Sequence, residues 1–567
     1  ELAARGLAVT VSPFLLMDIP PGNGLPDPYG EAEQAAFPWR GRITCFPAIS
    51  GDKTAAARAQ VESFFGSASA SDFTLNGDAV TYTGPDAWSY RRFVLHLAML
   101  AKASGVASRF LLGSELVRLT RVRDDTGAFP AVEELKALAG EVRAALGPAA
   151  EISYAADWTE YGAYHPDDGT GDVRFPLDAL WSDQNIDFVG IDWYAPLSDW
   201  RDWDHLDGAL WSSIYDQNYL AANVAGGEGY DWYYASDADR LAQTRTPITD
   251  SAHGEDWMFR VKDLHGWWQS AHHERPGGTR QPVSTEWTPQ SKPVRLIEIG
   301  CGAVDKGTNA PNVFHDPKSA ESGFPPFSEG TRDDDIQAAA LRALCQHWSV
   351  TSLENPVSAV YGGAMVPDDG LSVWAFDARP YPAFPVRSDV WSDGENWTLG
   401  HWLNGRTARS GLSDVLAELL KAADVPADLS AATASLPGHA VYGIQTVREA
   451  IEPLVYAFDL RCRQSETGLV FANGGDQAAI SIPEQDLVLA EGRSSAQRFT
   501  RNVTEHAVRG LRLSVLDPSA DYQPASVHIG VQEGDRDTHI QLPFALDADS
   551  AARLAGHLMV RLQTGAH

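Results

Sequence analysis

The stretch Arg109-Phe110-Leu111-Leu112-Gly113-Ser114-Glu115-Leu116 decides the fold prediction. Phe110, Leu111 and Leu112 form an apolar run typical of a buried strand, and polar residues follow where that strand ends. Downstream, Ala131–Leu146 carries apolar residues at helical spacing and stops at a Gly-Pro pair, after which Ile152–Ala155 is again typical of a strand. The order strand, helix, strand is the repeating unit of a parallel sheet.

The same alternation continues on both sides of this unit. A helix is predicted over Ser89–Ser104, ended by Gly105, and another begins at Asp333-Asp334-Asp335, whose acids suit a helix N-terminus. Five more strands are predicted: Val9–Met17, Arg42–Phe46, Phe188–Tyr194, Val294–Ile299 and Val360–Phe376. Seven strands alternating with helices favour an α/β fold, a (β/α)8 TIM-like barrel with large insertions. A doubly wound sheet is less favoured, because no strand leads into a glycine-rich phosphate turn. The eighth strand is either unrecognised or upstream of Glu1.

A second domain is expected after a change in composition between Tyr381 and Arg409, where Pro, Trp, Gly and Ser are frequent. We assign residues 1–385 to the barrel, 386–408 to a linker and 409–567 to an α+β domain. Three local signals support the α+β assignment: a helix over Ser413–Ala423, a capping box at Thr446 and Glu449, and a hairpin-like signal at Gly468–Phe471 with Asn473-Gly474-Gly475.

Charge and composition exclude several function classes. The 567 residues carry 44 Lys plus Arg against 76 Asp plus Glu, a net charge of −32 that repels phosphate backbones and anionic lipid. Direct nucleic-acid binding is therefore not expected. The longest apolar runs, such as Phe93–Leu100, fall short of the roughly 20 residues of a spanning helix, so no membrane segment is expected. The chain starts at Glu1 rather than Met, which suggests a processed or excised part of a longer protein.

No metal or cofactor is expected from the motifs. The four cysteines lie far apart without a CxxC pair, so we expect buried thiols. Neither HExxH spacing nor an EF-hand pattern occurs, and no GxSxG indicates a serine hydrolase.

Two glutamates directly follow predicted strands, Glu115 and, in Leu296-Ile297-Glu298-Ile299-Gly300, Glu298. In a barrel the carboxyl ends of the strands converge, so the two side chains should point into one cleft. Cleavage of a glycosidic bond needs such a pair, one acid to protonate the leaving oxygen and one carboxylate opposite it. The alternative is structural: each glutamate caps a helix or pairs with an arginine such as Arg118 or Arg295.

Further strand-end residues are candidates for binding sugar. Asp157, Asp192 and Tyr194 offer hydrogen bonds to hydroxyls, although salt-bridged structural roles are equally open. Nine of the 18 tryptophans lie between residues 181 and 268, and most of them are expected in the core. Trp193 and Trp374, beside strand ends, are the ones predicted to stack on sugar rings.

Several long motifs resemble, in order, the TIM-barrel-like domain of the gene transfer agent megatron family, the large baseplate protein of phage-tail-like particles. The resemblance covers roughly Val9–Pro385, and the chain from about Trp391 resembles the phage-tail hub region of that family. The motifs are Tyr90–His96, Gly113–Leu116, Ile152–Trp158, Val189–Tyr194, Gly227–Tyr234 and Asp305–Phe314.

The resemblance implies a relation to glycoside hydrolases that retain anomeric configuration, with Glu115 matching the acid/base and Glu298 the nucleophile. Many of those enzymes have Asn where this chain has Ser114. If the barrel is a retaining hydrolase, the two carboxyl groups should lie ~5–5.5 Å apart.

The resemblance also implies a place and partners. The place is the tail tip of an extracellular particle that is assembled in the cytoplasm. The partners are a bacterial envelope polysaccharide, other tail proteins and further copies of this chain. Three classes remain open: a true glycosidase, a carbohydrate-binding barrel without turnover, and a structural baseplate element. The presence of both carboxylates favours the first two.

Overall fold

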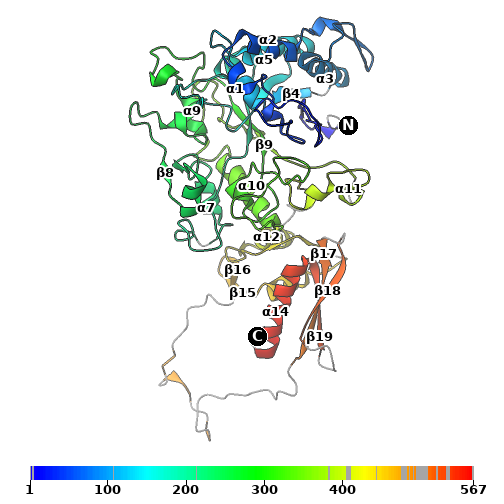
Figure 1. Ribbon diagram of the computed structural model, residues 1–567. Coiled ribbons are helices and arrows are strands. Elements are labelled where there is room, and N and C mark those ends of the chain that lie inside the picture. Colours follow the sequence, from blue (N-terminus) through cyan, green and yellow to red (C-terminus); the bar gives the residue numbers. More distant parts are fainter. Residues whose placement is uncertain are drawn as a thin grey trace. The chain divides into compact units, whose positions relative to one another are not determined.

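The computed structural model describes residues 2, 5–105, 107–211, 213–380, 383–403, 410–441, 443–473, 482–483, 486–488, 491–492, 508–518, 522–530 and 537–564. The chain divides into two compact units, Glu1–Asn404 and Gly405–His567 (Figure 1).

The first unit is built on a parallel sheet. Its strands hydrogen bond in the order β1-β4-β5-β6-β9-β10, every neighbouring pair is parallel, and the sheet curls into a half-barrel. The TIM-barrel-like prediction is therefore confirmed. The strands are β1 (Val9–Val11), β4 (Ala107–Ser114), β5 (Glu151–Asp157), β6 (Val189–Trp193), β9 (Val294–Ile299) and β10 (Leu371–Val373).

Three strand predictions need correction. Of Val9–Met17 only the first three residues, β1, form a strand. The stretch Arg42–Phe46 is not a strand: the Ile43 N–H bonds back to the Arg40 carbonyl and closes a 3-10 turn, Arg40–Arg42. Of Val360–Phe376 only β10 is extended in the sheet, because glycines and prolines at residues 362–370 turn the chain before it reaches the sheet.

Helices cover the sheet where the apolar spacing predicts them. In α3 (Tyr90–Ser104), Ser89 accepts the Arg92 N–H at the start, and Gly105 ends the helix at φ 66°. Asp333 caps α10 (Asp334–His347) in the same way. Helices α3 and α5 pack side by side on β4 (Figure 1). The others are α1 (Ala48–Gly51), α2 (Ala55–Phe65), α4 (Val117–Thr120), α5 (Pro130–Leu146), α6 (Asp178–Trp181) and α11 (Ala383–Val386).

Most of the tryptophans in the insertion between β6 and β9 pack in or against the hydrophobic core. Trp267 and Trp268 of the insertion, and Trp181 ahead of β6, are almost completely buried, as expected for most of the clustered tryptophans. The insertion holds α7 (Gln217–Ala222), β7 (Trp232–Tyr233), α8 (Asp237–Ala242), β8 (Thr246–Pro247) and α9 (Leu264–Gln269), and a separate hairpin joins β2 (Phe73–Asn76) to β3 (Ala79–Tyr82).

The second unit mixes helices and strands around its own apolar core. The capping box of Thr446 and Glu449 is confirmed at the start of α13 (Val447–Ala457). The hairpin joins β15 (Leu460–Ser465) to β16 (Gly468–Asn473), so its turn precedes Gly468; Gly474 and Gly475 lie outside the described residues. A four-stranded sheet has the order β14 (Gly438–His439), β19 (Asp537–Ala545), β17 (Gly510–Asp517), β18 (Gln523–Gly530). The remaining elements are β11 (Ser410–Gly411), α12 (Leu412–Lys421), β12 (Ala427–Asp428), β13 (Ser435–Leu436) and α14 (Ala548–Thr564).

The cysteine prediction holds for two residues only. Cys45 and Cys301 are buried thiols, whereas Cys345 and Cys462 are exposed, because each lies on the outer side of its helix or hairpin. No helix in the described part of the chain is both long and apolar enough to cross a bilayer.

Gly113 is expected to be irreplaceable next to the strand end that carries Glu115. Its φ is +154°, and a Cβ there would lie 1.8 Å from the Tyr90 hydroxyl, which donates to the Leu112 carbonyl. Gly113→Ala should lower the free energy of unfolding by about 2–3 kcal/mol in urea titrations. Tyr90→Phe in the same chain should recover part of the loss, since the next atom is 3.1 Å away.

Gly140 in α5 is the matched control, because a Cβ there meets nothing closer than 3.8 Å. Gly140→Ala should leave stability unchanged or raise it by up to about 1 kcal/mol. Equal unfolding curves for the two alanine variants would contradict the steric argument.

Candidate active site

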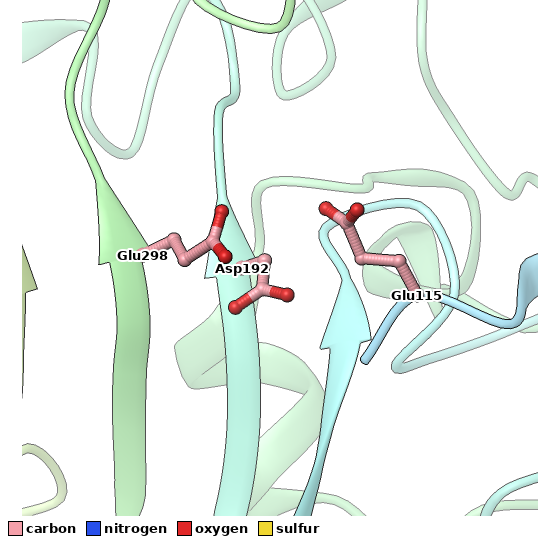
Figure 2. Close-up of side chains that lie close together, drawn as sticks. All are labelled: Glu115, Asp192 and Glu298. Atoms are coloured by element: carbon pink, nitrogen blue, oxygen red, sulfur yellow. The ribbon is translucent and has the colours of Figure 1, made fainter. Parts of the chain in front are cut away.

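The carboxyl ends of β4, β6 and β9 bring three acids together (Figure 2). One carboxylate oxygen each of Glu115, Asp192 and Glu298 lies within 4.8 Å of the other two. All three residues are buried, with exposed fractions of 6%, 0% and 8%. The two glutamates predicted from strand ends therefore do converge on one site.

The local backbone geometry orients the side chains of the three acids toward one another. In the sheet, Asp192 of β6 stands beside Glu298 of β9, which sets their carboxylates next to each other. Glu115 has the left-handed φ of 52°, and its N–H donates to the Ala155 carbonyl on β5. The chain turns there, so Glu115 points across the strand ends toward Glu298.

Arg40 supplies the cation of the site. Its Nη2 lies 2.8 Å from Glu115 Oε2 and 4.0 Å from Glu298 Oε1, and its Nη2 donates to Ser114 Oγ at 2.7 Å. Phe14 lies flat beneath the guanidinium, 3.8 Å from its Cζ. Sequence reasoning considered only Arg118 and Arg295 as partners and missed Arg40, which is 75 residues from Glu115.

Trp39 and Ser114 complete the contacts of the three acids. The Trp39 indole N–H donates to Glu115 Oε2 at 2.6 Å, and its backbone N–H donates to Glu321. Ser114 Oγ donates to Asp192 Oδ2 at 2.7 Å, whereas Asp192 Oδ1 has no hydrogen-bond partner among the described residues. The serine found in place of asparagine thus links Arg40 to Asp192.

Asp157 and Glu160 add two more buried carboxyl groups at the end of β5. Asp157 Oδ1 accepts hydrogen bonds from the N–H and hydroxyl of Thr159. Glu160 accepts from the hydroxyls of Thr120 and Tyr154. Sequence reasoning placed Asp157 at this edge, and the structure shows that its neighbours hold it in place by hydrogen bonds rather than by a direct salt bridge.

Burial and mutual repulsion raise the pKa values of these acids. Burial first, and then the charge of Glu115, raise the pKa of Glu298 to about 7, although Arg40 and the Tyr194 hydroxyl act in the opposite direction. The same two causes raise the pKa of Asp157 to about 6. Burial and the two glutamates raise the pKa of Asp192 well above its usual range. The raised pKa values oppose full ionisation of the cluster as the pH approaches neutrality.

The predicted sugar-binding residues have different surroundings. Tyr194 donates its hydroxyl to Glu298 Oε2 at 2.8 Å, so it contacts the glutamate rather than an open cleft. Trp374 is half-buried and stacks on Phe14 with ring centroids 5.9 Å apart. The sugar-platform prediction for Trp193 needs correction: only 1% of this residue is exposed, because its ring packs in the core near Tyr161.

Three carboxylate oxygens at this spacing are also a donor set that a hard cation could use. Arg40 Nη2, 2.8 Å from Glu115 Oε2, already places a positive charge beside this donor set.

A parallel sheet curled into a half-barrel, with paired glutamates at its strand ends, defines the first unit as a TIM-barrel-like domain. The family profile of the GTA TIM-barrel-like domain matches residues 88–385, and that of a putative phage tail protein matches residues 446–566. The chain belongs to the GTA TIM-barrel-like family, where GTA stands for gene transfer agent, and with its phage tail domain it is a component of such a particle.

Two solved structures are similar to parts of the chain. A chain of the virion of a native gene transfer agent particle is 25% identical over 30% of this chain and 40% of that one, with a TM-score of 0.27. A GH113 β-1,4-mannanase is 14% identical over 66% of this chain and 64% of that one, also with a TM-score of 0.27. This chain thus covers less than two thirds of either relative's own length. The comparison with curated proteins gives no match.

Glu298 should make the protein less stable as pH rises. Below its ordinary pKa of 4.5 the group is protonated in both the folded and unfolded states. Between pH 4.5 and about 7 the unfolded chain releases this proton while the folded one retains it, so folded stability falls. Glu298→Gln should therefore match the wild type at pH 4 and exceed it by roughly 1–3 kcal/mol at pH 8.

Urea titrations at both pH values measure this difference. Glu151→Gln at the other end of the sheet is the control, because the Glu151 side chain is 43% exposed and pairs with Arg109 and Arg295, away from the three acids. Parallel pH profiles for Glu298→Gln and the wild type would contradict the argument.

Proposed function

We propose that the chain is a baseplate component at the tail tip of the gene transfer agent particle, and that its barrel binds and cleaves a bacterial envelope glycan. In this proposal the particle is assembled in the cytoplasm of the producing cell. The phage tail domain contacts other tail proteins and further copies of the chain, while the barrel meets the recipient's surface. Membership of the GTA TIM-barrel-like family supports the setting.

The spacing of the two glutamates is the observation that carries the chemistry. Their nearest oxygens lie within 4.8 Å, close to the ~5–5.5 Å of retaining glycosidases and well below the ~6.5–9.5 Å of inverting ones. This spacing favours a covalent intermediate formed by one carboxylate and proton transfer by the other.

The protonation pattern bears on which glutamate does which task. The family resemblance assigns the nucleophile to Glu298, yet burial raises the pKa of Glu298 to about 7, and Glu115 is the group ion-paired with Arg40. Arg40 is paired with Glu115 Oε2, so a bound glycan would contact the other oxygen of Glu115, Oε1, while the ion pair remains formed. The assignment of Glu298 as nucleophile thus requires its proton to pass to Glu115 when substrate binds.

One observation favours the alternative, a binding or structural barrel without turnover. Glu115 is covered by the Trp39 indole and paired with an arginine, as in a structural ion pair. In that case the barrel would hold glycan, or serve only as a baseplate element, and neither glutamate would be needed for chemistry.

Substitution of the glutamates separates these functions. Glu298→Gln and Glu115→Gln should each lower the release of reducing ends from envelope polysaccharide by at least about 100-fold. Affinity for the polysaccharide should change by only a few fold, because neither carboxylate is needed merely to hold sugar. Reducing-end assays and binding titrations on the same protein measure both.

Glu151→Gln removes a carboxylate from the opposite end of the same sheet and should retain full turnover. A wild type that binds polysaccharide without releasing reducing ends supports the binding barrel. A wild type that neither binds nor cuts leaves the structural role.

Trp374→Ala tests the remaining predicted sugar platform. Trp374 is half-buried beside the site, so loss of its ring should weaken glycan binding and turnover together, by roughly tenfold. Trp193→Ala should instead destabilise the fold by about 3–5 kcal/mol, since it removes a core side chain. The reverse pattern in binding and unfolding titrations would refute the placement of both rings.

A further inference from the structure

A cavity lies in the N-terminal segment, before residue 88, where the match to the family profile of the barrel begins. It measures about 180 Å³, and its lining includes Met17, Asp27, Tyr29, Gln34, Pro38 and Arg42. Pockets for drug-sized ligands measure about 300–1,000 Å³, so this cavity suits a single ring.

The polar groups of the cavity are poorly paired with one another. The Arg42 guanidinium donates no hydrogen bond to any described residue, and its nearest carboxylate oxygens, Asp27 Oδ1 and Glu321 Oε1, are each 3.8 Å away. That separation is too long for a hydrogen bond but leaves room for a hydroxyl that accepts from Arg42 and donates to Asp27. Asp27 is buried and anchored, because its other oxygen accepts the N–H groups of Tyr29 and Glu31.

The surroundings select the class of ligand. A hydroxyl is both donor and acceptor, as a gap between a guanidinium and a carboxylate requires. Asp27 and Glu321 beside Arg42 disfavour a carboxylated sugar, and so does the net charge of −32. Met17 and Pro38 offer apolar surface to the C–H face of a pyranose, while the Arg42 guanidinium lies over the Tyr29 ring, 4.7 Å from its centroid.

The cavity adjoins the carboxylate site along the chain. Pro38 lines the cavity, and the next two residues, Trp39 and Arg40, both contact Glu115. One residue of chain spans at most about 3.6 Å, so the Cα atom of Pro38 in the cavity wall lies within about 7 Å of that of Arg40.

We infer that Asp27, Tyr29 and Arg42 form an accessory subsite for one neutral sugar ring of the glycan that the barrel engages. This inference rests on the proposed function and deepens it. The subsite adds affinity for the polymer and takes no part in bond cleavage.

The test compares Arg42→Gln and Asp27→Asn with the wild type on delipidated neutral envelope polysaccharide. Each variant should raise the dissociation constant and KM about tenfold, while kcat stays within about twofold, because a hydrogen bond to a charged group is lost away from the reacting atoms. Arg92→Gln is the matched control: Arg92 also lies over a tyrosine ring, Tyr82, but outside the cavity. It should bind like the wild type.

The outcomes separate the two proposals. If the wild type binds or cuts and Arg42→Gln equals Arg92→Gln, the subsite is refuted and the proposed function stands. If the wild type neither binds nor cuts, both fall. Tighter binding of an acidic polysaccharide than of a neutral one would refute the neutral sugar. If thermal melts show that Arg42→Gln is poorly folded, the nearly isosteric Asp27→Asn takes its place. A crystal soaked in neutral monosaccharides should show a ring in the cavity, with one of its hydroxyls between Asp27 and Arg42.

Discussion

The ion pair between Arg40 and Glu115 is the interaction on which the site depends. Four carboxyl groups, those of Glu115, Asp157, Asp192 and Glu298, are buried at the ends of neighbouring strands, and burial of unpaired charge is costly. Arg40 is itself only 6% exposed and faces two of them directly. Its remaining contacts, with Ser114 and the Phe14 ring, fix the guanidinium in one place. The N-terminal segment is therefore part of the site, although the family profile of the barrel begins at residue 88.

Glu160 is a fifth buried acid here, and two arginines among the described residues, Arg40 and Arg121, act on the five, so carboxyl groups outnumber cations. Protonation compensates for the missing positive charge. Burial and repulsion between the carboxylates raise the pKa values of Glu298 and Asp157 toward neutrality and raise that of Asp192 well above its usual range. Two-carboxylate chemistry needs one group protonated and one ionised at the same pH, and groups whose surroundings push their pKa values apart provide that condition. Arg40 lies 2.8 Å from Glu115 and 4.0 Å from Glu298, so the two glutamates have unequal surroundings.

Sequence reasoning found the parts of this site that local pattern determines. Glu115 and Glu298 follow apolar strands, and the ends of parallel strands must converge, so their meeting could be predicted without coordinates. The contact of Arg40 with Glu115 could not be predicted, because the residues that follow Arg40 have a strand-like pattern and no local signal indicates a contact with a residue 75 positions away. Trp193 was misjudged for a related reason: it is next to the strand end, but the pleat sends its side chain to the core. Local signals also located helices such as α3 and α10, where caps and spacing agree.

Two adjacent residues have different roles at the site: Trp39, which is partly exposed, covers Glu115, and Arg40, which is buried, supplies its positive charge. Trp39 is 37% exposed and contributes one N–H to Glu115, which a sugar hydroxyl can replace as a donor. Exchange of one hydrogen bond for another changes the free energy little, by about 1 kcal/mol, so displacement of the indole is compatible with glycan entry. Arg40 has no such substitute, because its removal would leave Glu115 as a buried charge without its cation, at a cost of about 3–5 kcal/mol. A glycan can therefore uncover the glutamates at Trp39 while Arg40 keeps the charge balance, and the closed arrangement does not by itself exclude a working site.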